Sequence, residues 1–216
     1  MKNNKLEPND NCKICKRLDI FRKQNRIEEP HWYNKPVKSF GSISSKILIV
    51  GLAPGKKGAN RTGRPFTGDG AGKTLYSTLI NHRFAKGNYC PNGLDDLELI
   101  NCRISNVVRC VPPQNKPKSS EFKNCSKFLK KEIDSMKNLE LILALGRDSY
   151  LSILKVFELK YKQFSFIHNN LNILPNKIKL ISSFHCSQYN TNTKRLTIKM
   201  FNDVFIKIKK NINFAL

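Results

Sequence analysis

The chain has 216 residues, a length that fits a single domain with a buried core. Hydrophobic residues make up 39% of it and gather in clear runs, which excludes a disordered chain. Lys and Arg outnumber Asp and Glu by 39 to 16, and the formal charge of +23 favours a polyanionic partner such as nucleic acid over a merely solvated basic surface.

The first residues, MKNNKLEPNDNCKICK, contain no apolar run typical of a signal peptide, and no segment approaches the length of a transmembrane helix. We therefore expect a cytoplasmic protein without a membrane partner. In that compartment, seven cysteines indicate metal binding or catalysis more often than disulfides.

Four short apolar runs, rich in β-branched residues, predict strands buried on both faces of a parallel sheet. In chain order they are KILIVGL (46–52), RISNVVRCV (103–111), LELILALG (139–146) and IKLISSFH (178–185). Amphipathic patterns predict helices at 70–84, at 119–136 with Ser120 as N-cap, at 148–157 and at 192–210. The alternation predicts an α/β fold, a three-layer α/β/α sandwich around a central, mostly parallel four-stranded sheet, in one domain over residues 1–216.

Ligands of open α/β sheets bind outside the carboxyl ends of the strands. This rule selects the four loops that follow the predicted strands, which are also the most polar and unusual stretches of the chain. They are GLAPGKKGANRTGRPF, CVPPQNKP, GRDS and HCSQYNTNT.

The stretch GANRTGRPFTGDGAGKT (58–74) ends like a phosphate-binding loop. Such a loop requires G-x-x-x-x-G-K-[ST], and the position of its first glycine holds Thr67. A polar loop precedes the stretch, whereas a phosphate-binding loop leaves directly from a buried strand. The spacing therefore argues against binding of a nucleoside triphosphate, and the stretch needs another explanation.

Four of the cysteines have a spacing that suits a metal site. Cys12-x2-Cys15 lies just before the first helix, and Cys110 and Cys125 follow with fourteen residues between them. Four thiolates bind either tetrahedral zinc or an iron–sulfur cluster. The wide second pair favours a cluster, because structural zinc sites usually take two close pairs, but the spacing leaves both open. Cys90 and Cys102 fit small buried apolar residues better.

Three segments together resemble the active-site segments of iron–sulfur uracil-DNA glycosylases, and most of all the fifth family, or type B. They are GLAPGKKGANRTGRPFTGDGAG, NVVRCVPPQNKP and FHCSQYNTNTKRLT, and the resemblance runs in order from Cys12 to about Thr197. It implies a repair enzyme that hydrolyses the N-glycosidic bond of uracil in DNA and leaves an abasic site, with hypoxanthine as a further base by family analogy. It also implies a 4Fe-4S cluster as the cofactor, held by the matching Cys12, Cys15, Cys110 and Cys125.

The resemblance assigns the base pocket to residues from two of these segments. Phe66 matches the aromatic residue that stacks on the flipped base, and Asn106 matches the residue that reads the pyrimidine edge. Gly51, Ala53 and Gly55 belong to the turn whose backbone would contact the base. By chemistry alone, a Phe after Pro is more often a core residue, and an Asn at a strand end often bonds local backbone.

Two residues are expected to act in catalysis. His185, in the place of the family's H-P-S segment, would donate a hydrogen bond to the base oxygen, and Asp69 is the matching acidic residue. Asp69 could equally be the N-cap of the helix that follows. Leu52 stands where related families carry an acidic or amide residue, and the type B group lacks such a residue at this place too. Cys186 replaces the proline of H-P-S. A Cys186–His185 nucleophile is discounted, because neighbours on a strand point opposite ways.

Asn60 and His168 are weaker candidates for lining the pocket. The expected partner is uracil-containing, double-stranded DNA, bound by a monomer. Its expected contacts lie in the site loops: Arg61, Arg64, Lys116, Ser187, Gln188, Tyr189 and Arg195. The loop from Ser187 to Thr193 would enter the groove of the duplex.

Two other functions remain open from the sequence. One is a nucleic-acid-binding protein without catalysis, stapled by a four-cysteine metal site. The other is a degenerate glycosylase that binds without cutting, which Leu52 and Cys186 would explain. The convergence of Phe66, Asn106 and His185 on separate strand-end loops would favour the enzyme.

Overall fold

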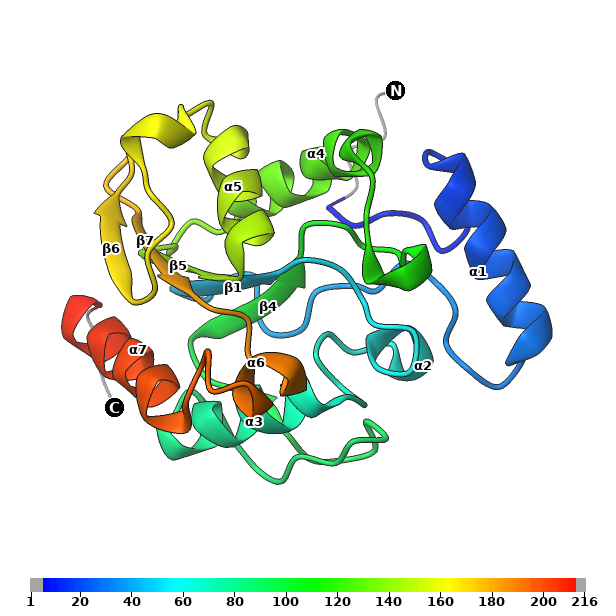
Figure 1. Cartoon of the computed structure of the whole chain (residues 1–216), viewed down its shortest axis with the longest axis horizontal. Coiled ribbons are helices and arrows are strands. Elements are labelled where there is room, and N and C mark those ends of the chain that lie inside the picture. Colours follow the sequence, from blue (N-terminus) through cyan, green and yellow to red (C-terminus); the bar gives the residue numbers. More distant parts are fainter. Residues whose placement is uncertain (1–5, 213–216) are drawn as a thin grey trace.

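The structure, a computed structural model, describes residues 6–212. Its centre is a sheet of five strands in the order β4-β1-β5-β7-β6 (Figure 1). These are β4 (Cys102–Asn106), β1 (Ile47–Gly51), β5 (Leu141–Leu145), β7 (Lys179–Ser183) and β6 (Asn170–Ile173). The first four are parallel, and β6 pairs antiparallel with β7. The predicted α/β/α sandwich is confirmed, but the expected number of four strands was wrong.

The fifth strand, β6, lies at the edge of the sheet and therefore buries little apolar surface. Its sequence, NLNI, has two apolar residues, of which Leu171 is partly buried and Ile173 is 66% exposed. The four predicted strands have the continuous apolar runs of the sheet interior, and an edge strand does not need such a run.

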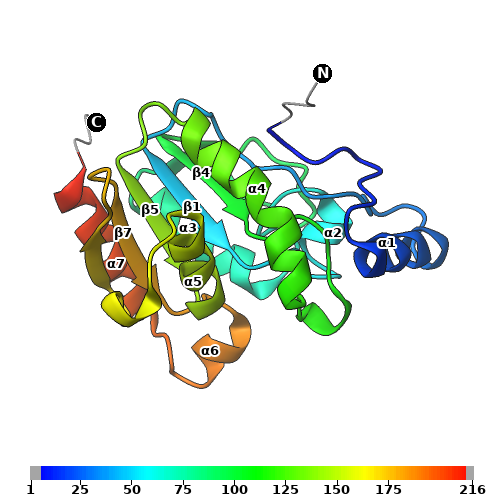
Figure 2. The same cartoon turned by 90° about the horizontal axis from the view of Figure 1, so that it is seen from above.

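Helices cover both faces of the sheet (Figure 2). On one face lie α3 (Gly70–Asn81) and α7 (Ile198–Asn211), and on the other lie α4 (Ser119–Ser135) and α5 (Arg147–Val156). Alternate residues of β1 serve the two faces, with Ile47 and Ile49 in the core under α3 and α7, and Leu48 and Val50 in the core under α4 and α5.

The remaining elements lie outside these layers. They are α1 (Lys16–Glu28), α2 (Ala59–Thr62), α6 (Gln188–Asn192), the short 3-10 turns at Pro113–Asn115 and Tyr161–Gln163, and a small hairpin of β2 (Ala85–Lys86) with β3 (Glu98–Leu99). Over residues 6–212, no helix combines the length and apolar character needed to cross a membrane.

Several predicted boundaries shift. The strand expected over 103–111 ends at Asn106, and the helix expected from residue 192 begins at Ile198. Thr197 is the N-cap of that helix, where its Oγ1 accepts a hydrogen bond from Met200 N at 3.1 Å. The helix predicted with Ser120 as N-cap begins at Ser119, so Ser120 lies within its first turn.

Candidate active site

A cavity of about 430 Å³ opens at the carboxyl ends of β1 and β4, beside the start of α3. Of the fourteen residues expected to act in catalysis, base binding or DNA binding, nine line it, contributed by four separate segments. Gly51, expected to contact the base, is not among them. The lining comprises Leu52, Ala53, Pro54, Gly55, Ala59, Phe66, Asp69, Gly70, Ala71, Asn106, Asn115, His185, Ser187, Gln188 and Tyr189. The fold therefore brings together segments that lie up to 137 positions apart in the chain, from Leu52 to Tyr189. We refer to this cavity as the base pocket.

The ring of Phe66 forms one wall of the base pocket. Phe66 has a left-handed backbone with φ of 53°, and two glycines make room for it. A Cβ on Gly51 would lie 2.5 Å from the Phe66 ring, and a Cβ on Gly72 would lie 1.8 Å from the Phe66 carbonyl oxygen. Gly72 of GAGKT thus makes room for the turn that carries Phe66 and is not needed to bind a phosphate. This accounts for the glycine that made the stretch look like a nucleotide-binding loop.

Asn106 ends β4 directly opposite Gly51 of β1. The residue is only 3% exposed and its side-chain amide forms no hydrogen bond within residues 6–212, but the amide atoms are not fully enclosed, because they open into the cavity that Asn106 lines. A buried amide normally has a partner, because leaving its polar atoms unpaired costs about 1–3 kcal/mol. Asn106 therefore presents an unused donor and an unused acceptor to a molecule in the base pocket.

His185 follows β7 and stacks on Phe66, with 5.8 Å between the ring centroids and 27° between the planes. Burial lowers the pKa of His185 below its ordinary value, and the nearby Asp69 carboxylate opposes that shift only in part. The ring is therefore neutral at pH 7, with one N–H donor. Within the part of the chain that the structure describes, neither ring nitrogen of His185 has a hydrogen-bond partner.

Asp69 is both a helix cap and a pocket residue. Its Oδ1 accepts a hydrogen bond from Gly72 N at 3.1 Å, so the alternative role as N-cap of α3 is confirmed. Its Oδ2 lies against Gly55 and Gly58, at 3.2 Å and 2.5 Å from where a Cβ would stand. The carboxylate is exposed, lines the base pocket and is fixed by its cap, a geometry that is compatible with the expected catalytic role as well.

Asn115 is a pocket residue that the sequence analysis missed. It follows Gln114, and both have left-handed backbones with φ near 55°. Residues held in this region cost energy and gather at ligand-binding turns. The loop CVPPQNKP was selected for its place after a strand, but only Cys110 and Lys116 were named from it. The position of Asn115 could have been noted as an Asn in a turn rich in proline.

The loop after His185 forms the mouth of the base pocket. Ser187 caps α6, where its Oγ accepts from Asn190 N at 3.4 Å, and Tyr189 is 73% exposed. Gln188 packs against Gly70 of α3. Cys186 is fully buried and directs its Sγ toward the carbonyl oxygen of Ala71 at 3.6 Å. Burial raises the pKa of the Cys186 thiol, so it stays protonated and does not serve as a nucleophile.

Three expected DNA contacts lie outside the base pocket but near it. Lys116 is exposed beside Asn115, and Arg61 donates from Nε to the carbonyl oxygen of Lys57 at 2.9 Å. The guanidinium of Arg195 lies 5.0 Å from the centroid of the Phe184 ring, in an adjoining cavity that shares Leu52 and His185 with the base pocket.

Arg64 was expected to contact DNA, and the structure corrects this. Its Nη1 and Nη2 donate to the two carboxylate oxygens of Asp95, each at 2.6 Å, and its guanidinium lies among the rings of Phe40, Tyr76 and Tyr89. The side chain is 13% exposed. Its charge and its donors are therefore used inside the protein, where they hold the hairpin loop that carries Asp95.

Asn60 and His168 do not line the base pocket. Asn60 is fully buried and donates from Nδ2 to Oδ1 of Asn34 at 2.8 Å. His168 Nδ1 accepts from the backbone N–H of Phe184 at 3.2 Å, and its ring stacks on that of Phe184. Both are supports for neighbouring segments.

The four cysteines of the expected metal site line one small cavity between the N-terminal segment, the loop after β4 and α4. Burial raises the pKa of Cys110 to about 12 and that of Cys125 to about 11. Arg109 N donates to Cys125 Sγ at 3.3 Å, and Asn124 Nδ2 to Cys15 Sγ at 3.6 Å. Over residues 6–212, however, no three His, Cys, Asp or Glu side chains lie close enough together to hold a single metal ion.

Two of the remaining cysteines differ from this set. Cys102 is fully buried and directs its Sγ toward the carbonyl oxygen of Phe84, as expected for a small apolar residue. Cys90 is only half-buried, so the expectation that it is a core residue was wrong.

Comparisons with known proteins agree with this geometry. A family model described as "Uracil DNA glycosylase superfamily" matches residues 38–209. The type-5 uracil-DNA glycosylase of Thermus thermophilus is 37% identical over 205 residues, which cover 92% of this chain and 93% of that protein. The type-5 uracil-DNA glycosylase of Pyrobaculum aerophilum is 31% identical over 198 residues, covering 90% and 86% of the two chains.

A type-4 uracil-DNA glycosylase of Saccharolobus solfataricus is 27% identical over 201 residues, covering 90% of this chain and 84% of that one. The resemblance inferred from the site segments is therefore confirmed over nearly the whole length of the chain. This chain belongs to the uracil DNA glycosylase superfamily.

Proposed function

We propose that this protein is a uracil-DNA glycosylase that hydrolyses the N-glycosidic bond of uracil flipped out of double-stranded DNA, with hypoxanthine as a further deaminated base. The observation that carries the proposal is the convergence of Phe66, Asn106 and His185 on one cavity. The Asn106 amide and the His185 ring nitrogens both lack partners among residues 6–212, so the cavity offers unused hydrogen-bonding groups beside an aromatic wall. A surface that only binds DNA backbone has no use for such a cavity.

The chemistry follows from the charges that develop during cleavage. An N-glycosidic bond breaks through an oxocarbenium-like transition state, in which the sugar becomes positive and the departing base negative. Phe66 would stack on the base and Asn106 would bind its polar edge. The neutral His185 would donate its N–H to the base oxygen, where negative charge grows. Asp69, with one carboxylate oxygen in the helix cap, would stabilise the sugar or orient the water.

DNA binding would supply the energy to extrude the nucleotide, a cost of a few kcal/mol. The exposed Tyr189 and the neighbouring Gln188 lie at the pocket mouth, where they would fill the space left in the duplex. Lys116, next to the lining residue Asn115, and Arg195, in the adjoining cavity, would contact phosphates, with Arg61 of α2 as a further candidate. The enzyme is proposed to act as a monomer, because one chain contributes every group named here.

We also propose that Cys12, Cys15, Cys110 and Cys125 hold a 4Fe-4S cluster. Their shared cavity and the N–H groups aimed at two of the sulfurs support this donor set. The spread of the thiols favours a cluster over zinc: around one zinc ion, sulfurs at about 2.3 Å from the metal lie close together, whereas a cluster separates them by its own width. The cluster would act as a structural cross-link between the N-terminal segment and α4.

Leu52 supports a second candidate, a protein that binds damaged DNA without cutting it. This apolar side chain lines the base pocket where related families place a group that orients water. In this case Phe66, Asn106 and His185 would still hold the flipped base, but no hydrolysis would follow.

The experiment that decides uses a labelled duplex with one U·G pair, treated with wild type, His185→Ala or Asp69→Ala and then with or without hot alkali. Strand cleavage that requires alkali, and that both variants lose, would support a monofunctional glycosylase. Intact strands from a preparation that still binds the U·G duplex more tightly than a C·G duplex would favour the binding-only candidate. An equal affinity for both duplexes, again without cleavage, would contradict both.

A further inference from the structure

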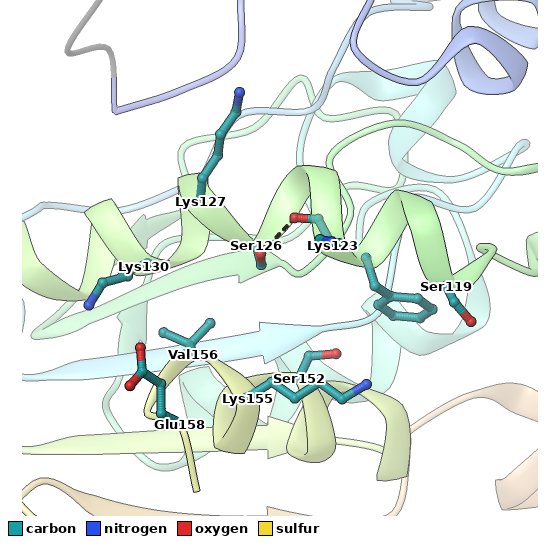
Figure 3. A pocket seen from close by; sticks show the side chains of 10 residues that line it. Ser119, Lys123, Ser126, Lys127, Lys130, Ser152, Lys155, Val156 and Glu158 are labelled. Carbon is teal, nitrogen blue, oxygen red and sulfur yellow. Dashed lines mark hydrogen bonds between the residues drawn. The ribbon is translucent and has the colours of Figure 1, made fainter. Parts of the chain in front are cut away.

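A second cavity, of about 550 Å³, lies between α4 and α5, on the face of the sheet away from α3 and α7 (Figure 3). It is larger than the base pocket and shares no lining residue with it. The lining combines three kinds of side chain: an apolar floor of Phe122 and Val156, hydroxyls on Ser119, Ser126 and Ser152, and a rim of lysines. We refer to it as the α4/α5 groove.

The rim of the α4/α5 groove is strongly basic. Lys123, Lys127 and Lys130 come from α4 and Lys155 from α5, against the single carboxylate of Glu158. Within residues 6–212, Lys123 and Lys155 form no ion pair, and Lys130 reaches Asp134 only at 3.6 Å. Lys123 and Lys155, on facing helices, thus carry positive charges that no ion pair compensates. These two charges repel each other, and an anionic ligand between them would relieve the repulsion.

The groove also continues from the active site along the chain. Asn115 lines the base pocket, Lys116 and Lys118 follow it, and Ser119 begins both α4 and the groove. Because α4 follows β4 and runs back along the sheet, its first turn lies at the edge where the base pocket opens. A chain of phosphates leaving the active site therefore meets Lys116 and Lys118 before it reaches Lys123.

We propose that the α4/α5 groove binds a single-stranded segment of the DNA that carries the damaged base. This inference rests on the proposed function for its substrate. Proteins that bind single strands pair a basic track for the phosphates with aromatic or apolar surfaces for unpaired bases, and the groove has both. Phe122 and Val156 pack against the core under α4 and α5 and are only partly buried, so the apolar surface that they leave in the groove is available to a base. A duplex hides its bases inside, so it would use the lysines but not this apolar surface.

The test uses three substrates that contain the same U·G pair: a short blunt duplex, the duplex with a single-stranded tail of about ten nucleotides, and the duplex extended by the same length in paired form. Tails are placed on either strand in turn. For the wild type, we expect a tail on one strand to lower KM by about tenfold, because each stacked base contributes roughly 1–3 kcal/mol. The kcat should not change, and the paired extension should give a smaller gain.

The matched variants each lose two charges. The groove variant is Lys123→Gln/Lys155→Gln, and the control is Lys137→Gln/Lys210→Gln. Lys137 and Lys210 are exposed and lie at the opposite edge of the sheet, since their neighbours Asn138 and Asn211 contact Ser44 before β1 and Lys179 of β7. We expect the groove variant to lose the gain from the tail and to cleave the blunt duplex like the wild type. The control should keep the gain.

The proposal is overturned if the paired extension helps as much as the tail, or if the groove variant keeps the tail effect. A separate readout does not depend on cleavage: a fluorescent single strand without uracil should bind the wild type and the control, and bind the groove variant at least tenfold more weakly. Equal binding of this single strand by all three proteins would contradict the proposed role of the α4/α5 groove, even if the enzyme cleaves uracil. Selective binding without any cleavage would instead retain the groove and contradict the proposed enzymatic function.

Discussion

The ring of His185 stacks on the ring of Phe66, with 5.8 Å between centroids, so the proposed hydrogen-bond donor and the proposed base platform support each other. Each comes from a different strand end, and neither ring nitrogen of His185 is engaged by another residue in the region 6–212. The protonation state of His185 therefore determines how many N–H groups its ring can donate in the base pocket.

The kcat/KM for cleavage should not change with pH in the range where a histidine with an ordinary pKa loses its second ring proton. Burial lowers the pKa of His185 below its ordinary value of about 6.5, so the neutral ring predominates in the folded protein above that pH. We expect kcat/KM for a U·G duplex to stay level between about pH 6.5 and 8. A mechanism that needs imidazolium would instead lose activity over this rise, by up to tenfold per pH unit.

Substitution of Gly72 by Ala should disable the base pocket. The new Cβ would lie 1.8 Å from the Phe66 carbonyl oxygen, so the turn that carries the aromatic ring must move. We expect kcat/KM to fall by at least tenfold, which corresponds to about 1.4 kcal/mol of transition-state stabilisation.

Thr74→Ala is the control in the same helical turn, because Thr74 does not line the base pocket and its hydroxyl donates only to the carbonyl oxygen of Gly70, at 3.4 Å. Equal kinetics for the two variants would contradict the role given to Gly72.

Asn115→Ala should weaken catalysis without unfolding the protein. The residue is exposed and lines the base pocket, so its amide is available to the substrate. Loss of one hydrogen bond would lower kcat/KM by about tenfold or less. Gln114→Ala is the control, since Gln114 has the same left-handed backbone but does not line the pocket. A similar loss in both variants would mean that the turn, and not the amide, matters.

Asp95→Asn should cost stability and leave DNA binding intact. Hydrogen bonds from Arg64 lower the pKa of Asp95 to about 2 from 3.8, so the pair stabilises the fold above pH 3.8, and this contribution is lost as the pH falls toward 2. The shift corresponds to about 2 kcal/mol.

We expect urea unfolding at pH 7 to show a loss of this size, and the salt dependence of DNA binding to stay the same. A steeper salt dependence would instead mean that the released Arg64 contacts DNA phosphates.

The iron content should depend on the four clustered cysteines and not on the others. We expect Cys15→Ser to abolish the visible absorbance and most of the iron, and to lower the unfolding midpoint, because the N-terminal segment loses its link to α4. Cys90→Ser is the control, since Cys90 lies outside this cavity. Equal iron in both variants would contradict the proposed ligand set.

Much of the fold followed from local sequence. The four parallel strands are continuous apolar runs, and of the central sheet only β6 was missed, since an edge strand requires no such run. The two-residue strands β2 and β3 of the small hairpin were also missed, because they are too short to form a pattern. Asp69 was ambiguous because one carboxylate serves a cap and a pocket. Arg64 was misassigned because its partner Asp95 lies 31 positions away, and such pairing is set by tertiary packing. Asn115 required knowledge of which part of its loop faces the cavity.

Residues 69–72, DGAG, connect the first turn of α3 to three of the segments that form the base pocket. Asp69 lies against the turn at Gly55, Gly70 against Gln188, Ala71 accepts from Cys186, and Gly72 borders the Phe66 carbonyl. The thiol of Cys186 thus links the loop after His185, which we propose to contact DNA, to α3 through a side chain. A change in the tilt of this end of α3 would therefore move the Phe66 ring and the loop after His185 together. Base recognition and DNA binding, as proposed here, would then change together.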